Sequence, residues 1–270
     1  MIIRDCSVEG IRIRLQHHRA GRNGILLIHG NSSSKEVFAK QLEKLMKTGL
    51  GVVVPDLPGH GGSDDSKRPY STYSFPGYAG ILGSLMRQIG YRSYHVLGWS
   101  LGGHIGIEML ARDPAVRSLL ITGTPPVRLN PVGVAAGFRW TGVTALAGRK
   151  HFRPEDVRRY TSAMMGIRLP DDHQFFRIAR RTDGNARLWM VANGMAGCGV
   201  DQVEAVSTSD RPIAVVQGAH DPFLRIDYLG RVPYRNLWHG RPVMLDGGHA
   251  AHWQSPKAFN EAMMDFITTH

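Results

Sequence analysis

The sequence predicts an α/β fold in which a mostly parallel, twisted sheet is flanked by helices and interrupted by a helical insertion. Short apolar runs alternate with amphipathic stretches along most of the chain, which is the pattern of β-α-β units. The alternation stops between residues 125 and 206, where only helical patterns remain. With 270 residues, 42% of them hydrophobic and 20% charged, the chain is long enough for one large core.

The expected strands are of two kinds. Residues 1–16 alternate in polarity around Glu9-Gly10, as in a hairpin that begins a sheet. The later strands are short, continuous apolar runs, which indicates burial on both faces of a parallel sheet. They are expected at residues 25–28, 51–55, 94–97, 118–122, 213–217 and 243–245.

The expected helices separate a core from a cap. Helical periodicity is found in the core at residues 35–47, 73–88, 101–112 and 256–268, and in the insertion at 154–165 and 172–181. We therefore divide the chain into an α/β core, residues 1–124 and 207–270, and a helical cap, residues 125–206. The cap follows a parallel strand, at the sheet edge where ligands bind in open α/β folds, so it is expected to form the wall of a substrate pocket.

Ser100 stands in the pentapeptide Gly98-Trp99-Ser100-Leu101-Gly102, directly after an expected strand and directly before an expected helix. A strand, a sharp turn that carries serine, and a helix form the nucleophile elbow of α/β-hydrolases. The glycines leave room for a strained turn that lifts the hydroxyl above the sheet. Ser100 is therefore the expected nucleophile; the alternative is that it only caps the helix beginning at Leu101.

A serine hydroxyl needs a base to become a good nucleophile, and the base needs a carboxylate to orient it. Asp221 follows the expected strand at 213–217, and His249 follows the one at 243–245. The chain order serine, acid, histidine is that of the α/β-hydrolase triad. Because each residue follows the carboxyl end of an expected strand, Ser100, Asp221 and His249 should converge at one edge of the sheet.

Other residues compete for these roles. Asp227 and Asp246 are alternative acids, although an isolated acid in a loop is more often a turn or capping residue. His252 is an alternative base, which a helix starting at Ala251 would turn away from the site. Four further histidines are expected to be structural because none lies on the last loop: His29, His60, His95 and His104.

The loop His29-Gly30-Asn31-Ser32-Ser33 follows the first parallel strand, where α/β-hydrolases place one backbone donor of the oxyanion hole. We expect the backbone N–H groups of Asn31 and Leu101 to form the oxyanion hole. A serine mechanism needs neither a metal nor a cofactor, and neither is expected here.

The net charge of +11 raises the question of nucleic-acid binding. Residues 125–206 hold twelve Lys/Arg and seven Asp/Glu, but no nucleic-acid-binding motif accompanies them, so a solvated basic face is expected. The two cysteines give no disulfide framework, and neither a signal peptide nor a membrane span is recognised. We therefore expect a cytoplasmic protein with a small-molecule partner and no nucleic-acid or membrane partner, while its oligomeric state stays open.

Several segments together resemble one family within the α/β-hydrolases. These segments are residues 29–34, 56–61, 98–109, 122–126, 181–184, 212–216 and 248–250. They are similar to the α/β-hydrolase type of N-acyl-homoserine lactonase, over nearly the whole chain. The resemblance implies that the protein opens the lactone ring of a bacterial quorum-sensing signal without a metal. It places the family's triad on Ser100, Asp221 and His249, and its oxyanion asparagine on Asn31.

The resemblance also implies contacts to the substrate. A cap tyrosine of the family falls on Tyr160, and Trp99 beside the serine is taken as a second contact; the alternative for Tyr160 is simple packing in a cap helix. Where the family carries glutamate as its acid, this chain has Asp221, whose shorter side chain alters the reach to His249. Acyl specificity is expected from apolar side chains of the cap: Phe152, Tyr160, Met164, Met165 and Trp189.

Other functions of the same fold stay open. Ser100 argues against haloalkane dehalogenases and epoxide hydrolases, which use an aspartate nucleophile. Metal-dependent lactonases need a His-x-His-x-Asp-His run that this chain lacks. A general carboxylesterase or lactonase acting on other small esters, a cofactor-free oxygenase, and a small-molecule receptor without turnover remain alternatives.

Overall fold

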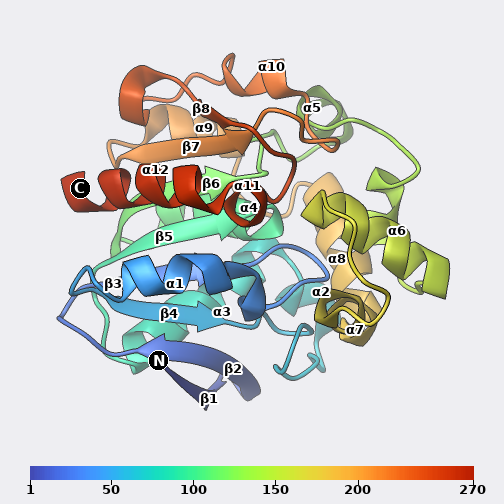
Figure 1. Cartoon of the computed structure of the whole chain (residues 1–270), viewed down its shortest axis with the longest axis horizontal. Coiled ribbons are helices and arrows are strands. Elements are labelled where there is room, and N and C mark those ends of the chain that lie inside the picture. The colour runs from blue at the N-terminus through green and yellow to red at the C-terminus, as the bar shows by residue number, and fades with distance from the viewer.

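The computed structural model describes all 270 residues and is organised around one eight-stranded sheet (Figure 1). Across the sheet the strands follow the order β1-β2-β4-β3-β5-β6-β7-β8. They are β1 (Ile2–Val8), β2 (Ile11–His18), β3 (Gly24–Ile28), β4 (Gly51–Pro55), β5 (Tyr94–Trp99), β6 (Val116–Thr122), β7 (Ile213–Gly218) and β8 (Val243–Leu245). The pairings of β2 with β1 and β4 are antiparallel, and all others are parallel. The expected mostly parallel sheet is confirmed.

The antiparallel part begins with the expected hairpin. Glu9 and Gly10 join β1 to β2, and their φ values of +50° and +79° are those of a two-residue hairpin turn. On β2, Ile13 and Leu15 are buried while Arg14 between them is partly exposed. The parallel strands β3, β4, β5 and β7 are buried along their whole length, as their continuous apolar sequences predict.

Helices cover both faces of the sheet. In Figure 1, α1 and α12 lie in front of the sheet with α11 beside them, and α3 and α4 lie behind it. The core helices are α1 (Ala39–Leu45), α2 (Pro69–Thr72), α3 (Phe75–Gln88), α4 (Leu101–Arg112), α10 (Ile226–Leu229), α11 (Ala251–Gln254) and α12 (Pro256–Thr269), with the short 3-10 turns η1 (Lys35–Phe38) and η3 (Trp238–Gly240).

Two expected helices begin differently in the structure. The helix expected at 73–88 starts at Phe75, because the Ser74 hydroxyl caps it by accepting the Gly77 N–H over 3.1 Å. Pro76 fits the first turn of that helix, where no backbone donor is needed. The helix expected at 35–47 is a 3-10 turn, η1, followed by α1.

The segment between β6 and β7 is helical, and α6, α7 and α8 gather beyond one end of the sheet, on the right of Figure 1. Its elements are α5 (Pro131–Gly137), η2 (Thr144–Gly148), α6 (Pro154–Met165), α7 (Gln174–Arg181), α8 (Gly184–Met195) and α9 (Gln202–Thr208). α6 has the expected bounds, and α7 begins two residues later than expected. α9 packs against α4 and crosses the expected cap boundary at residue 206.

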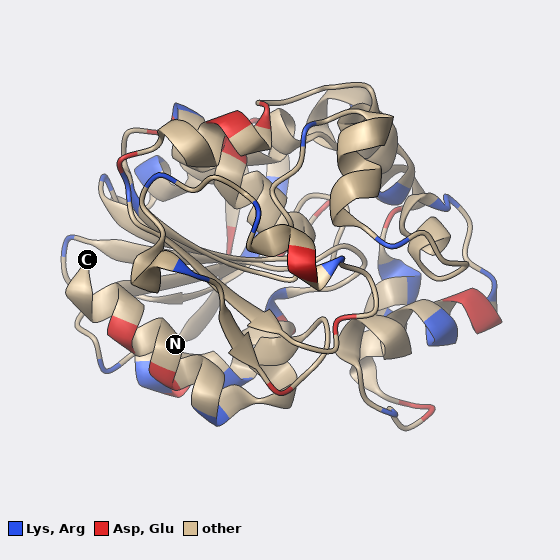
Figure 2. Cartoon of the chain, turned by 90° about the horizontal axis from the view of Figure 1, so that it is seen from above, with Lys and Arg blue, Asp and Glu red and all other residues tan.

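A single cluster of buried apolar residues extends from the sheet into this segment and includes Tyr160 and Met164. The insertion therefore packs onto the sheet end as part of one continuous core. Figure 2 shows basic and acidic residues interspersed on the outer helices and loops. None of the helices combines the length and the apolar character that crossing a membrane requires.

Candidate active site

Ser100 occupies a sharp turn between β5 and α4. Its φ of +55° and ψ of −118° are a conformation that residues other than glycine adopt only under strain. The turn requires glycine on both sides: a side chain at Gly98 would collide with the Gly102 carbonyl, and one at Gly102 with the Ile28 carbonyl. Thr124 Oγ1 donates to the Ser100 carbonyl over 2.8 Å and so ties the turn to the segment after β6. This is the local geometry of a nucleophile elbow.

Asp221 and His249 meet beyond the carboxyl ends of β7 and β8. His249 Nδ1 lies 2.8 Å from Asp221 Oδ2, and both residues are buried. A carboxylate only accepts hydrogen bonds, so Nδ1 carries the ring proton and Nε2 keeps a lone pair. Asp221 Oδ1 accepts the Phe223 N–H over 2.8 Å. The aspartate, although shorter than glutamate, therefore reaches the histidine.

Gln217 holds this acid in place, and the sequence reasoning missed it. The residue is fully buried at the end of β7, and its Nε2 donates to Asp221 Oδ2 over 2.9 Å. Its Oε1 accepts the Gly123 N–H over 2.8 Å, which fixes the amide so that Nε2 faces the acid. The available signal was a polar residue within an otherwise apolar, fully buried strand, because such residues are nearly always hydrogen-bonded.

The histidine has one uncommitted nitrogen. His249 Nε2 is enclosed and has no hydrogen-bond partner in the protein, Ser100 Oγ included. Trp99, the residue before the serine, donates from Nε1 to the His249 carbonyl over 2.8 Å and so links the elbow to the histidine loop. Hydrogen bonds between nucleophile and base are often long before substrate binds. His249 Nε2 is thus a buried ring nitrogen without a partner in the protein.

Two backbone donors flank the serine. The N–H groups of Asn31 and Leu101 have no acceptor within the protein, and both residues line the cavity that Ser100 lines. The Leu101 N–H is the first of α4, at the positive end of the helix dipole. The Asn31 side chain is held separately, because its Nδ2 donates to the Ala147 carbonyl over 2.9 Å and to the Tyr160 hydroxyl over 3.3 Å.

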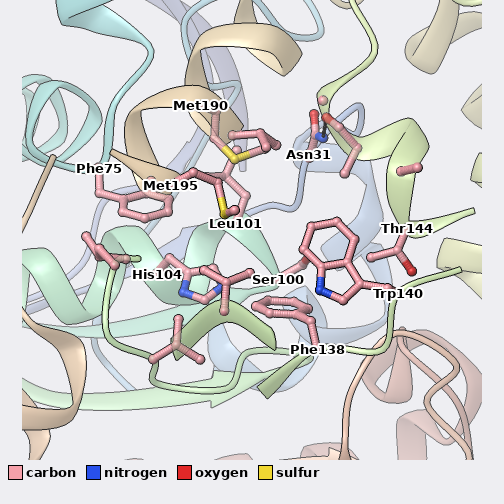
Figure 3. A pocket seen from close by; sticks show the side chains of 18 of the residues that line it. Asn31, Phe75, Ser100, Leu101, His104, Phe138, Trp140, Thr144, Met190 and Met195 are labelled. Atoms are coloured by element: carbon pink, nitrogen blue, oxygen red, sulfur yellow. Dashed lines mark hydrogen bonds between the residues drawn. The ribbon is translucent and has the colours of Figure 1, made fainter. Parts of the chain in front are cut away.

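A cavity of about 180 Å³ opens beside Ser100 between the sheet and the insertion (Figure 3). Its wall is mainly apolar and contains no Lys, Arg, Asp or Glu. The insertion contributes most of it, through residues Val127, Leu129, Val134, Phe138, Trp140, Thr144, Ala145, Ala147, Gly148, Tyr160, Met190, Val191, Gly194 and Met195. Trp140 is 56% exposed and stands at the cavity mouth. The cavity suits an uncharged, mainly apolar group attached to a reacting centre at Ser100.

The cap residues expected to set acyl specificity lie mostly outside this cavity. Of the five, only Tyr160 lines this cavity. Met164 and Met165 line a smaller pocket that shares Asn31 and Tyr160 with this cavity. Phe152 and Trp189 pack against Arg187 and Tyr70. Phe152, for example, lies 4.1 Å from the Arg187 guanidinium. Much of the wall comes instead from residues 138–148 and from α8. The first stretch has no regular periodicity, and the periodicity of α8 does not indicate which of its faces lies toward Ser100.

Trp99 does not line this cavity but borders the smaller pocket that contains Asn31 and Tyr160. It is fully buried, and the indole packs against the His249 and His252 rings at centroid distances of 5.7 and 5.0 Å. Successive side chains of a strand point to opposite faces, so adjacency to Ser100 in sequence does not place Trp99 beside the substrate. Its contacts make it a positioning residue for the histidine loop.

The rival residues lie apart from this arrangement. Asp227 is exposed and hydrogen-bonds Arg231, and Asp246 is almost fully exposed. His252 is buried in α11, where neither ring nitrogen has a partner. No group of three or more His, Cys, Asp or Glu side chains is placed to hold a metal ion. Of the histidines expected to be structural, only His104 lines the cavity.

The model of the alpha/beta hydrolase family matches residues 25–262. The chain belongs to this family. It is also similar to the solved structure of an N-acyl homoserine lactonase, AidH, in which a serine-to-glycine mutant is complexed with N-hexanoyl homoserine lactone. The TM-score is 0.93 at 38% sequence identity, and the match covers 99% of this chain and 97% of the AidH chain.

Two more distant relatives come from the genus Cupriavidus. The dihydrolipoyllysine-residue acetyltransferase component of the acetoin cleaving system of Cupriavidus necator is 26% identical over 94% of this chain, which spans 66% of that relative's length. The 2-hydroxy-6-oxononadienedioate/2-hydroxy-6-oxononatrienedioate hydrolase of Cupriavidus pinatubonensis is 24% identical over 98% of this chain and 93% of its own. These two relatives are named for different substrates.

Proposed function

We propose that this protein is a serine hydrolase that opens the lactone ring of N-acyl homoserine lactones. The observation that carries the proposal is the 38% identity with AidH over nearly the full length of both chains. AidH is named as an N-acyl homoserine lactonase and was solved with N-hexanoyl homoserine lactone. The apolar cavity beside Ser100 supports the proposal, because an acyl chain needs such a wall.

In this proposal Ser100 is the nucleophile. Its Oγ attacks the lactone carbonyl carbon while His249 Nε2 takes the hydroxyl proton, and Asp221 stabilises the resulting imidazolium. The N–H groups of Asn31 and Leu101 stabilise the oxyanion of the tetrahedral intermediate. The ring C–O bond then breaks, and His249 returns the proton to the ring oxygen. An acyl-enzyme with a free hydroxyl on the homoserine side chain remains.

The second half of the reaction needs water. The hydroxyl produced by ring opening stays tethered to the acyl-enzyme, so its effective concentration near the ester is high and it can close the ring again. His249 therefore has to activate a water that attacks faster than the tethered hydroxyl. Attack by water breaks the Ser100 ester and yields N-acyl homoserine, whose new carboxyl group releases a proton at neutral pH.

The uncharged wall of the cavity favours a substrate with a neutral acyl chain. The substrate named for the Cupriavidus pinatubonensis relative is a dioate, with two carboxylates. Burying a carboxylate is costly unless a cation or several donors meet it, and no Lys or Arg lines this cavity. The buried Arg187 is committed to the carbonyls of Arg149 and Lys150. A neutral ester or lactone is therefore the better fit.

A general carboxylesterase remains the second candidate, because a neutral wall also accepts simple esters. The test is kcat/KM, measured by proton release, on N-butanoyl and N-hexanoyl homoserine lactone, γ-butyrolactone and ethyl hexanoate. We expect N-hexanoyl homoserine lactone to be the best of these substrates. Faster turnover of the simple ester would favour the carboxylesterase, and saturable binding of a lactone without turnover would indicate a receptor.

We also propose that residues 125–206 act as the cap that selects the acyl chain, since most of the cavity wall comes from them. The cytoplasm is the proposed compartment. Cys6 and Cys198 are free thiols, as a reducing compartment maintains them.

A further inference from the structure

His104 brings a polar ring into the apolar part of the cavity. It lies on α4, four residues after Ser100, and lines the cavity with Phe75 and Phe138 (Figure 3). Its ring centroid is 5.3 Å from that of Phe75, in a stacked arrangement, and 5.8 Å from that of Phe138. A histidine between two aromatic rings of a ligand cavity is not accounted for by the triad or the oxyanion donors.

One nitrogen of this ring is committed to the protein. His104 Nδ1 lies 2.9 Å from Gln202 Oε1, and the Val127 N–H donates to the same oxygen over 3.3 Å. The backbone donor fixes the Gln202 amide with its oxygen toward the histidine. Nδ1 must therefore donate, and the ring proton resides there. Burial lowers the pKa of His104 to about 4, so the ring is neutral near pH 7.

The other nitrogen is available to a ligand. His104 Nε2 is an acceptor without a hydrogen-bond partner in the protein, yet it is not enclosed as the unpartnered ring nitrogens of His249 and His252 are. An apolar chain that covered this acceptor would remove it from water without a replacement donor, which costs free energy. A chain that carries a donor at this point avoids the cost.

We propose that His104 selects N-acyl homoserine lactones whose acyl chain carries a hydroxyl on its third carbon. The inference rests on the proposed function. The third acyl carbon lies about 6 Å from the attacked carbonyl carbon, because the amide spans about 3.8 Å and one bond is added at each end. One helical turn, about 5.4 Å, separates His104 from Ser100 along α4. The third acyl carbon of a lactone held at Ser100 can therefore come level with His104, which lines the same cavity one turn further along α4.

Three substituents at this carbon should behave differently. A 3-hydroxyl donates to Nε2, an unsubstituted chain leaves Nε2 unpaired, and a 3-oxo group places a second acceptor against it. The test is kcat/KM on the N-hexanoyl, N-(3-hydroxyhexanoyl) and N-(3-oxohexanoyl) homoserine lactones. We expect the 3-hydroxy substrate to exceed the unsubstituted one by about 2- to 13-fold, and the 3-oxo substrate to be the poorest.

A pair of variants assigns the preference to Nε2. His104→Asn keeps a donor near the position of Nδ1 and removes Nε2, so the ratio of 3-hydroxy to unsubstituted kcat/KM should fall toward one. His104→Gln puts an amide near the position of Nε2 and should keep more of the preference. A wild-type ratio of one, or an unchanged ratio in His104→Asn, would overturn the inference. Inactivity of the wild type on all three lactones would instead overturn the proposed function, and the inference with it.

Discussion

Gln217 Nε2 donates a hydrogen bond to Asp221 Oδ2, the same oxygen that lies 2.8 Å from His249 Nδ1. With Phe223 N–H on the other oxygen, the carboxylate is held by donors at both of its ends. The imidazole is oriented by that carboxylate, so the direction of Nε2 depends on a glutamine that does not line the cavity. Gln217 is therefore a positioning residue for the proposed triad.

Replacing Gln217 by leucine should lower kcat and leave KM nearly unchanged, because the acid loses a donor while the cavity wall is untouched. We expect a loss of about 2- to 13-fold in kcat, the effect of one hydrogen bond. Gln41→Leu is the matched control, since Gln41 is equally buried but hydrogen-bonds the His252 carbonyl and Asn260. Equal losses of kcat in the two variants would show that Gln217 contributes only to stability.

The assignment of the acid is tested by Asp221→Asn and Asp227→Asn. An amide at position 221 favours the wrong imidazole tautomer, as in serine proteases, and should lower kcat by about 10^4-fold without unfolding the protein. Asp227 is on the surface and pairs with Arg231, so its amide should have little effect on kcat. Circular dichroism checks the fold of both variants, and a reversal of the two kinetic effects would refute the assignment.

The fold was predictable from sequence because its signals are local. β4, Gly51–Pro55, is a continuous apolar run, and α4 begins and ends at Leu101 and Arg112 as its periodicity predicts. The pairing of Asp221 with His249 was predictable because parallel strands end at one edge of the sheet, so residues that follow the neighbouring strands β7 and β8 lie close together there.

The wall of the cavity was not predictable in the same way. Phe138 and Trp140 reach the cavity because the insertion folds back over the sheet end, and nothing periodic in their segment marks that path. Gln217 was missed for a different reason. Its polar side chain within an apolar strand indicates a hydrogen bond, but the Gly123 N–H that fixes its amide is too distant in sequence to be identified as the partner.

Tyr160→Phe tests the contact of the cap with the substrate. The Tyr160 hydroxyl oxygen accepts from Asn31 Nδ2, which leaves its proton to donate to the amide carbonyl of an acyl homoserine lactone. The variant should lower kcat/KM on N-hexanoyl homoserine lactone by about 2- to 13-fold. The loss on γ-butyrolactone, which has no amide, should be smaller. Equal losses on the two substrates would mean that Tyr160 acts only through packing or through Asn31.

His252 should make the protein less stable in acid. Burial lowers the pKa of His252 to about 3, whereas in the unfolded chain it is near 6.5. The contribution of neutral His252 to the free energy of unfolding is fully present above pH 6.5 and is lost as the pH falls toward 3. The reason is that in this range the unfolded chain takes up a proton at His252 that the folded chain does not. The free energy of unfolding should decrease by about 1.4 kcal/mol per pH unit in this range from His252 alone.

The substitution His252→Phe should remove this pH dependence of the free energy of unfolding. Neither ring nitrogen has a partner, and the ring packs against Phe38, Phe259 and Trp99, so phenylalanine loses no side-chain hydrogen bond. Between pH 7 and pH 5 the variant should gain about 2 kcal/mol relative to wild type in urea unfolding. A difference between the two proteins that does not change with pH would show that His252 is not held neutral by burial.

The central claim, that Ser100 opens the lactone, is tested most directly by the rate of proton release from N-hexanoyl homoserine lactone with wild type and with Ser100→Ala. We predict rapid release by the wild type and a decrease in kcat of about 10^4-fold or more in the variant. Calorimetry should show that the variant still binds the lactone, since the cavity wall is intact. A folded Ser100→Ala protein that retained a tenth of the wild-type kcat would contradict the account.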